Sequence, residues 1–426
     1  MEELMQYVWN YGLWPLTAVK TVDGHRIDII DRGQLNHNSG PDFFNAKVRV
    51  DDQVWAGNIE MHVRASDWHR HGHDDDPAYD NVVLHVVQYD DCAITRRSDG
   101  KVIPQITMRC AADFSDRYRA FVHNPQAQLP CAAEIGTFPS IYVTDWVDSL
   151  AFERLQRKAD DVHRLLDTYN GSLGLTAYVM LARGLGFGTN ADAMEQLART
   201  VPLKRLLQHQ DNVAVIEAIL LGCGGLLHEQ APRDNYEAAL VSDYNFYSEK
   251  YGLHGLTRPQ WRSRLRPTNA PERRVATLAA MIAGGFPFPG NVFSVQNVYE
   301  AKALFNYTIS PYWTDHINFG QPSQSTPAGF SRSTVDLLIV NVAVPLLYAY
   351  GEHVGDPARS ECAVEILQSL KPEQNRLVQT FTDAGMKCPD AFTSQAYIQL
   401  HKNYCSQRKC LFCRIGHRLL AARVAP

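Results

Sequence analysis

The spacing of apolar residues changes partway along the chain, and this change limits the folds that the chain can adopt. Between residues 25 and 91, apolar and polar residues alternate or form short runs rich in Val and Ile, which is typical of β-strands. From about residue 145, apolar residues recur every three or four positions, which is typical of amphipathic helices. The sequence therefore predicts an α+β protein with an N-terminal sheet and a mostly helical remainder.

The length of 426 residues is enough for two or three domains. We predict a mixed α/β domain over residues 1–115, a mostly helical domain over 116–385 and a Cys-rich metal-binding segment over 386–426. The formal net charge of -5 provides no global field that attracts nucleic acid, so any such binding must come from local patches.

Two apolar features bear on targeting. The N-terminus opens with two Glu and lacks the basic start and apolar run of a secretory signal. The apolar segment at 335–351 falls short of the about 20 residues that a membrane span needs, and it contains Asp336, Asn341 and Pro345. We therefore predict a buried, kinked helix there and a cytoplasmic protein with no membrane partner. The oligomeric state stays open.

A pair of carboxylates lies in the predicted sheet. Asp42 follows a Pro at the start of one predicted strand, and Glu60 lies in the next. Asp51 and Asp52 between them are a candidate hairpin turn, which would make the two strands antiparallel and let the carboxylates meet. His62 shares the face of Glu60 because side chains alternate along a strand.

Two converging carboxylates are the minimum set that binds Mg²⁺ or Mn²⁺, and such an ion polarises a phosphoryl oxygen and activates water. We predict Asp42, Glu60 and His62 as catalytic residues, and the same three with His85 as metal ligands. His85 lies in a short apolar strand, where an imidazole needs a partner. The alternatives are a turn Asp, a solvated strand Glu and a core His bonded to a carbonyl.

The order of helix, strand, "PD", hairpin, "E-x-H", short helix and strand resembles the core of the PD-(D/E)xK nuclease superfamily over about residues 1–90. The resemblance implies a restriction-endonuclease-like fold, metal-dependent hydrolysis of phosphodiester bonds and nucleic acid as a partner. In that family a Lys orients the attacking water, but this chain has His62 at that position. The alternative is therefore a catalytically inert protein of the same fold that binds nucleic acid or acts as a scaffold, unless Lys47 supplies the missing ammonium.

The segment "SDWHRHGHDDD" places His69, His71 and His73 among acidic residues. Imidazoles and carboxylates bind zinc or another transition metal when three or four of them converge. A zinc-dependent hydrolase that uses this loop is a further alternative, and a solvated polar loop is the simpler one.

Four of the nine Cys follow the spacing C-x16-C-x4-C-x2-C near the C-terminus, at Cys388, Cys405, Cys410 and Cys413. The x2 pair lets two thiolates bind one metal ion, and Cys405 is close enough to be a third ligand. Either zinc or an iron-sulfur cluster satisfies this spacing. The fourth ligand is Cys388 or Cys131, and unrelated buried thiols are the alternative. The trio is similar to the cluster-binding Cys of some branches of the nuclease superfamily.

The stretch "WRSRLRPTNAPERR" is rich in Arg, whose planar fork suits phosphate, and its Trp can stack on a base. Salt bridges within the helical region are the alternative. The predicted phosphate-binding residues are Arg262, Arg264, Arg266, Arg273 and Arg274.

Several of these segments together, "GPDFFNAKVRV", "RLRPTNAPERR" and "YCSQRKCLFCRIG" among them, resemble a bacterial family common in the Bacteroidetes lineage and described as a domain of unknown function. The resemblance spans nearly the whole chain. It implies a shared architecture and assigns no activity.

Overall fold

The computed structural model describes residues 1–14, 19–36, 39–109, 116, 118–119, 121, 129–136, 138–256, 261–262, 269–286, 289–323 and 326–421. The chain forms two compact units, one of residues 1–137 with 404–426 and the other of residues 138–403. The sequence predicted segments of 1–115, 116–385 and 386–426. Residues 404–426 pack with the N-terminal sheet, and the helical unit extends from residue 138 to residue 403.

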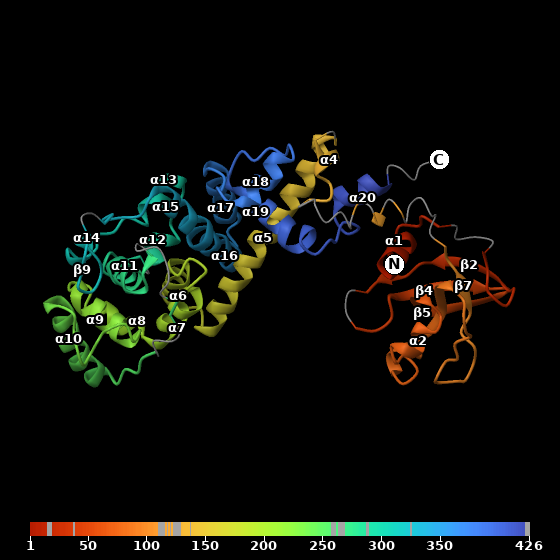
Figure 1. Cartoon of the computed structure of the whole chain (residues 1–426), viewed down its shortest axis with the longest axis horizontal. Helices are drawn as coiled ribbons and strands as arrows, with labels where there is room; N and C mark the ends of the chain where they lie inside the picture. The colour runs from red at the N-terminus through yellow and green to blue at the C-terminus, as the bar shows by residue number, and fades with distance from the viewer. Residues whose placement is uncertain are drawn as a thin grey trace. The chain divides into compact units, whose positions relative to one another are not determined.

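A mixed sheet of seven strands is the centre of the first unit (Figure 1). Its strands are β1 (Val19–Lys20), β2 (Arg26–Asp31), β3 (Gln34–Leu35), β4 (Phe43–Val50), β5 (Gln53–Arg64), β6 (Val82–Tyr89) and β7 (Gln105–Thr107). The order is β1-β2-β4-β5-β6-β7, with β3 beside β4. β2, β4 and β5 are antiparallel neighbours, whereas β5, β6 and β7 run parallel. The alternating patterns therefore correctly predicted the four longest strands.

The hairpin of β4 and β5 is the part of the sheet that positions the acidic residues. Val50 pairs with Gln53 across the predicted turn at Asp51 and Asp52. Asp51 has a φ of 51°, a left-handed conformation that Asp tolerates better than most residues. The hairpin prediction is confirmed.

Helix α1 (Glu2–Asn10) packs against the sheet through its apolar residues, which recur at helical spacing. Leu4, Met5 and Val8 join sheet residues such as Ile59 and Met61 of β5 in one core. Buried residues of the C-terminal segment belong to the same core: Cys410, Leu411 and, in α20 (Arg414–Ala421), Leu420.

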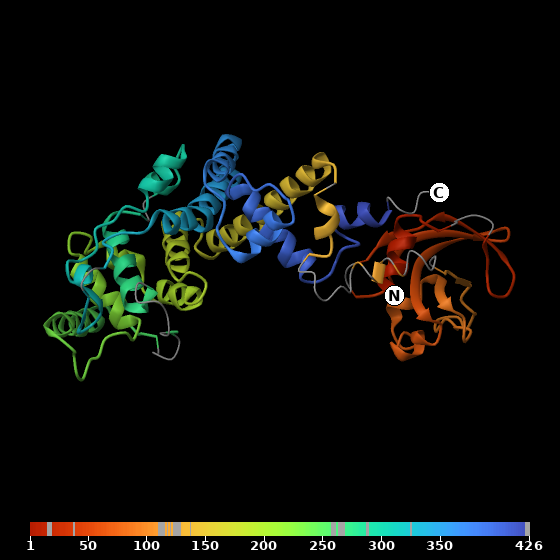
Figure 2. The same cartoon turned by 45° about the horizontal axis from the view of Figure 1, so that its top comes forward.

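The connection from β5 to β6 forms a second, smaller core. It contains α2 (Asp67–Arg70) and a 3-10 helix (Pro77–Tyr79), in agreement with the predicted loop and short helix. Trp68 and Tyr79 pack there against Val82 of β6. In both views α2 lies away from α1, with strands of the sheet between them (Figures 1 and 2). Side chains of β5 that alternate with Ile59 and Met61 therefore face this connection.

The second unit is helical, as the sequence predicted. Its helices are α5 (Ser140–Thr168), α6 (Leu173–Leu185), α7 (Ala191–Thr200), α8 (Leu203–Leu207), α9 (Val213–Cys223), α10 (Asn235–Tyr251), α11 (Pro271–Ala283), α12 (Pro289–Val292), α13 (Val298–Ala303), α14 (Tyr312–Asp315), α15 (Arg332–Leu338), α16 (Val344–Val354), α17 (Pro357–Ser369), α18 (Arg376–Asp383) and α19 (Ala391–Leu400). A short ribbon of β8 (His316–Asn318) and β9 (Gln321–Pro322) lies among them.

The apolar segment predicted as a kinked helix spans Arg332–Val354 and is long and apolar enough, by length and composition, to cross a membrane. However, 61% of its most apolar window is buried within the protein, as in a core helix. A π-helical stretch, Ile339–Ala343, separates α15 from α16 just before Pro345. Such a stretch accommodates the missing N–H and the ring of Pro345.

Gly57 provides a test of the β5–β6 pairing. A Cβ at this buried position would lie 2.5 Å from the Asn81 carbonyl oxygen and from Val83 Cγ1. We expect Gly57→Ala to destabilise the sheet by about 1–3 kcal/mol because backbone must move to admit the methyl group. Hydrogen exchange of the β5 and β6 amides measures the change. Val54→Thr, at an exposed position of the same strand, should change it by less than about 0.5 kcal/mol; equal effects would contradict the tight approach.

Candidate metal centre

Neighbouring strands bring the predicted acidic and imidazole side chains together. Glu60 and His62 are two residues apart in β5 and share one face of the sheet. Glu60 is the register partner of His85 in the parallel strand β6. Asp42 immediately precedes β4, the antiparallel neighbour of β5.

The two carboxyl groups lie side by side. The Asp42 backbone N–H donates to Glu60 Oε2 at 3.1 Å. Asp42 Oδ2 accepts the Met61 N–H at 2.9 Å, and its Oδ1 accepts the side-chain amide of Gln6 at 2.8 Å. The Met61 N–H and the Gln6 amide thus hold Asp42 in place beside Glu60.

Burial makes negative charge unfavourable at this pair. It raises the pKa of Asp42 to about 8, with further contributions from the nearby carboxylates of Glu60 and Glu2. It also raises the pKa of Glu60 to about 8. Two ionised carboxylates are therefore not stable here without a compensating cation.

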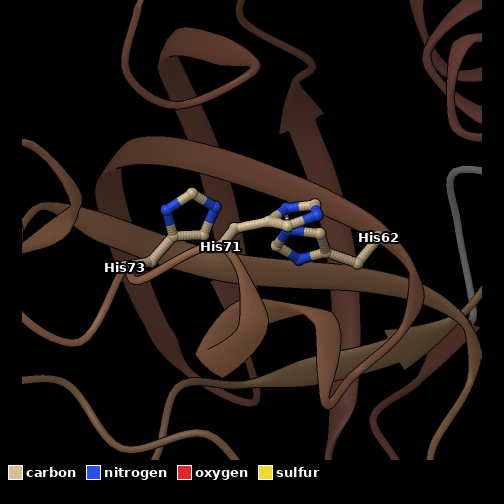
Figure 3. A group of neighbouring side chains, drawn as sticks. All are labelled: His62, His71 and His73. Carbon is tan, nitrogen blue, oxygen red and sulfur yellow. Dashed lines mark hydrogen bonds between the residues drawn. The ribbon is translucent and has the colours of Figure 1, made fainter.

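Two imidazoles, those of His62 and His73, approach the other oxygen of Glu60, and a third, that of His71, lies beside His62. His62 Nε2 lies 3.1 Å from His71 Nδ1 and 3.5 Å from Glu60 Oε1. His73 Nε2 lies 3.3 Å from the same oxygen. One ligand nitrogen from each of His62, His71 and His73 lies within 4.8 Å of the others. Figure 3 shows the rings of His62 and His71 close together, with the ring of His73 to one side.

These separations resemble those around a metal ion. Nitrogen and oxygen ligands at about 2.0–2.1 Å from a tetrahedral ion lie about 3.3 Å from one another. Three of the contacts, at 3.1, 3.3 and 3.5 Å, are close to that value. Among the described residues, the buried His73 Nε2 has no hydrogen-bond partner. The three imidazoles therefore fit a bound cation, and Glu60, which approaches two of them, offers a further ligand.

A chain of hydrogen bonds determines which nitrogen of His62 carries its proton. Gln105 Nε2 donates to Asp90 Oδ1 at 2.6 Å and to the Cys92 carbonyl at 3.3 Å, which turns Gln105 Oε1 toward His85. This oxygen accepts the Nδ1–H of His85 at 2.8 Å. The Nε2 of a neutral His85 then accepts the Nδ1–H of His62 at 2.8 Å. His62 Nε2 is left unprotonated, with its lone pair available to a metal.

Burial keeps these imidazoles neutral. It lowers the pKa of His62 to about 2 and that of His85 to about 4, and the neighbouring His residues lower the pKa of His62 further. Neutral imidazole is the form that binds a metal. Both nitrogens of His85 are used in hydrogen bonds. In this arrangement His85 orients His62, whereas the sequence predicted it as a metal ligand.

The His-rich loop contributes unequally to the cluster. His73 stacks on Tyr79, with ring centroids 3.8 Å apart, which fixes its ring. His71 is exposed and reaches the cluster from the loop after α2. His69 points elsewhere and pairs with Asp74 at 2.7 Å on the surface. Lys47, the possible source of an ammonium, is exposed in β4.

The sequence did not predict several partners of the site. Glu2 and Gln6 lie on the first turns of α1, four residues apart and hence on one helix face, but only the packing of α1 brings them to Asp42. Gln105 belongs to the short strand β7, which the sequence analysis did not identify. Its pairing with β6 places it beside His85.

The predicted Cys ligands fall in both units. Cys405, Cys410 and Cys413 are buried in the first unit, to which Cys131 also belongs. Cys388 belongs to the helical unit, where its Sγ donates to the Asp390 carbonyl at 3.8 Å.

The predicted phosphate-binding Arg residues lie in the helical unit, and Arg264 and Arg266 fall outside the described residues. The backbone N–H of Arg262 donates to Asn190 Oδ1 at 2.9 Å. Arg273 is buried and donates to the carbonyls of Trp313 and Pro327. The guanidinium of Arg274 lies 4.4 Å from the centroid of the Phe187 ring. Arg273 and Arg274 are thus engaged within the unit, and phosphate binding stays a prediction.

The affinity of the centre for a divalent cation should rise with pH. Because the pKa values of Asp42 and Glu60 are raised to about 8, both groups hold protons at neutral pH until a cation displaces them. We expect affinity to increase up to about tenfold per pH unit for each proton released, and to level off above about pH 8. Calorimetry in buffers of different ionisation enthalpy counts the protons. An affinity independent of pH between about 6 and 8 would contradict the assignment.

His71→Ala and His69→Ala form a matched pair within one loop. Both side chains are exposed, so neither change should unfold the unit. His71→Ala removes a ligand and should weaken metal binding by more than about 100-fold, since even outer partners of ligands contribute 10- to 100-fold. His69→Ala should leave affinity within about threefold, within the scatter that a surface change produces. Metal content after dialysis against a chelator gives the readout, and equal losses in both variants would exclude the proposed ligand set.

The chain was compared with known proteins. No curated protein and no solved structure matches it. A family model described as a protein of unknown function (DUF2851) matches residues 2–376, which include the whole carboxylate and imidazole cluster and end before the Cys405 to Cys413 segment. The chain therefore belongs to the DUF2851 family.

Proposed function

We propose that the first unit is a metal-dependent hydrolase of phosphodiester bonds, and that its metal ion is bound by Glu60, His62, His71 and His73. The observation that carries the proposal is the approach of three imidazole nitrogens and a buried carboxylate oxygen at ligand-to-ligand separations. The hydrogen-bonded chain behind His62 supports it, because second partners of this kind orient metal-binding histidines.

The ligand types favour a transition metal. Imidazole suits zinc, iron, nickel or copper, whereas Mg²⁺ takes oxygen ligands almost alone. Three imidazoles and one carboxylate therefore favour zinc or a similar ion over the Mg²⁺ that the carboxylate pair predicted. Mn²⁺ accepts both ligand types and stays a candidate.

Nucleic acid is the proposed substrate class, and two features support it. Helix α1 precedes the antiparallel strands β2, β4 and β5, and a crossover through α2 leads to the parallel strand β6. This order is similar to the PD-(D/E)xK core, and on that proposal Asp42 and Glu60 would correspond to its acidic pair. A bound ion would also supply the positive charge that attracts a phosphate to an otherwise acidic site.

Each group of the site then has its own chemical role. An ion that added water or substrate as a fifth ligand would polarise a phosphoryl oxygen and lower the pKa of that water. Asp42, beside Glu60, is the proton acceptor for that water. A bound cation would displace the proton that Asp42 holds in its absence, and the resulting carboxylate could accept a proton from the water. His85 and Gln105 keep His62 in the tautomer that binds the ion.

A cleavage assay tests the proposal. Full-length protein loaded with zinc, manganese or magnesium is incubated with bis(p-nitrophenyl) phosphate and with end-labelled single- and double-stranded DNA and RNA. We expect metal-dependent cleavage, and Asp42→Asn should slow it by about 10²–10⁴-fold, the usual contribution of a general base. Glu3→Gln removes a charge from the exposed side of α1 and should retain full activity. Loss of activity in both variants, or none in Asp42→Asn, would count against the assigned role.

A structural metal in an inert protein is the second candidate. Four protein ligands complete a tetrahedral ion and leave no position for water, which is typical of structural zinc. In that case the metal-loaded protein cleaves none of the substrates, and chelation lowers the melting temperature of the first unit. Nucleic-acid binding that is unchanged by Asp42→Asn would then favour a binding or scaffold protein.

A further inference from the structure

The C-terminal Cys trio is held in a tight chain reversal. The Arg408 N–H donates to the Cys405 carbonyl at 3.2 Å, and the Cys410 N–H donates to the Arg408 carbonyl at 2.8 Å. Arg408 has a φ of 55°, a left-handed conformation that is uncommon for a long side chain. A Cβ at Gly416 would lie 2.3 Å from the Cys410 carbonyl oxygen, so the start of α20 folds closely onto this turn. The reversal gathers three buried thiols.

A fourth thiol from a distant part of the chain joins them. Cys131 directly precedes α4 (Ala132–Ile135), the short orange helix beside α20 in Figure 2. Burial raises the pKa of Cys131 to about 12, and electrostatic interactions with Cys413 and Cys410 add to the shift. Burial likewise raises the pKa of Cys405, with additions from Cys131, Cys413 and Cys410. The four thiols are therefore close enough to interact, in largely desolvated surroundings.

Such desolvated surroundings favour a bound cation over ionised thiols alone. Buried thiolates are unstable without a positive partner, and metal binding deprotonates thiols outright. Cys131, Cys405 and Cys410 form no disulfide. We propose that Cys131, Cys405, Cys410 and Cys413 bind one metal centre, which fastens residues 404–426 to the N-terminal sheet unit and is separate from the histidine centre.

Four thiolates suit either a single zinc ion or an iron-sulfur cluster, since both centres use four Cys ligands. The chemical class of the centre is therefore a thiolate-bound metal, and metal and sulfide analysis distinguishes the two forms.

The choice between Cys131 and Cys388 gives a matched experiment. Full-length protein, Cys131→Ser and Cys388→Ser are purified without oxygen, and iron, sulfide, zinc and the visible absorption spectrum are measured. We expect the wild type and Cys388→Ser to carry the full metal content, and Cys131→Ser to lose at least half of it. Iron with sulfide identifies an iron-sulfur cluster, and zinc without sulfide identifies a single zinc ion. A wild type that carries neither would overturn the proposal. Full metal content in Cys131→Ser, or its loss only in Cys388→Ser, would overturn the proposed ligand set.

A measurement on the wild-type chain covers the case in which Cys131→Ser does not fold. Native protein is alkylated with iodoacetamide before and after the metal is removed by a chelator, and the labelled Cys are mapped by mass spectrometry. We expect Cys131, Cys405, Cys410 and Cys413 to change from protected to reactive together. Cys388 should react to the same extent in both states, because it belongs to the helical unit. Unchanged reactivity of Cys131 would contradict the proposal.

Discussion

Two carboxyl groups buried side by side, Asp42 and Glu60, set the main constraint on the first unit. Removing a carboxylate from water is unfavourable by several kcal/mol, and a second one nearby adds repulsion. The protein keeps them there with specific donors, the Met61 N–H, the Asp42 N–H and the amide of Gln6. Because such a pair is costly to retain, the arrangement supports the proposal of a site that exchanges protons for a cation.

The same constraint applies to the imidazoles, for which burial disfavours the positively charged form. A buried imidazolium is as unfavourable as a buried carboxylate, so His62 and His85 are neutral and each must find both a donor and an acceptor. Gln105 fixes the direction of this series of hydrogen bonds, because its amide nitrogen donates to Asp90. The rings of His85 and His62 follow this direction, which leaves His62 Nε2 without a proton. A side chain in the short strand β7 thereby determines whether a nitrogen more than one strand away can bind a metal.

Periodic patterns predicted the parts of this site that depend on periodic structure. Alternation in β5 placed Glu60 and His62 on one face, and a two-residue turn placed Asp42 at the adjacent strand. The loop contributions followed no period, so His71 and His73 were not distinguishable from His69 before the loop was seen to fold over β5. For Arg273 and Arg274, the sequence pattern did not reveal the packing around the side chains. Their spacing suggested phosphate, but the packing of the helical unit surrounds them with carbonyl oxygens and aromatic rings.

The presence of His62 where the nuclease superfamily has Lys has a different consequence when the whole cluster is considered. An ammonium at this position would contribute a permanent charge but no ligand, whereas a neutral imidazole contributes a lone pair and no charge. In the proposed centre, His62 would help His71 and His73 to hold an ion that carries two positive charges. This ion would supply the positive charge that the His62 side chain lacks. On this view the departure from the nuclease pattern alters which metal the site prefers, and it does not by itself remove the capacity for hydrolysis.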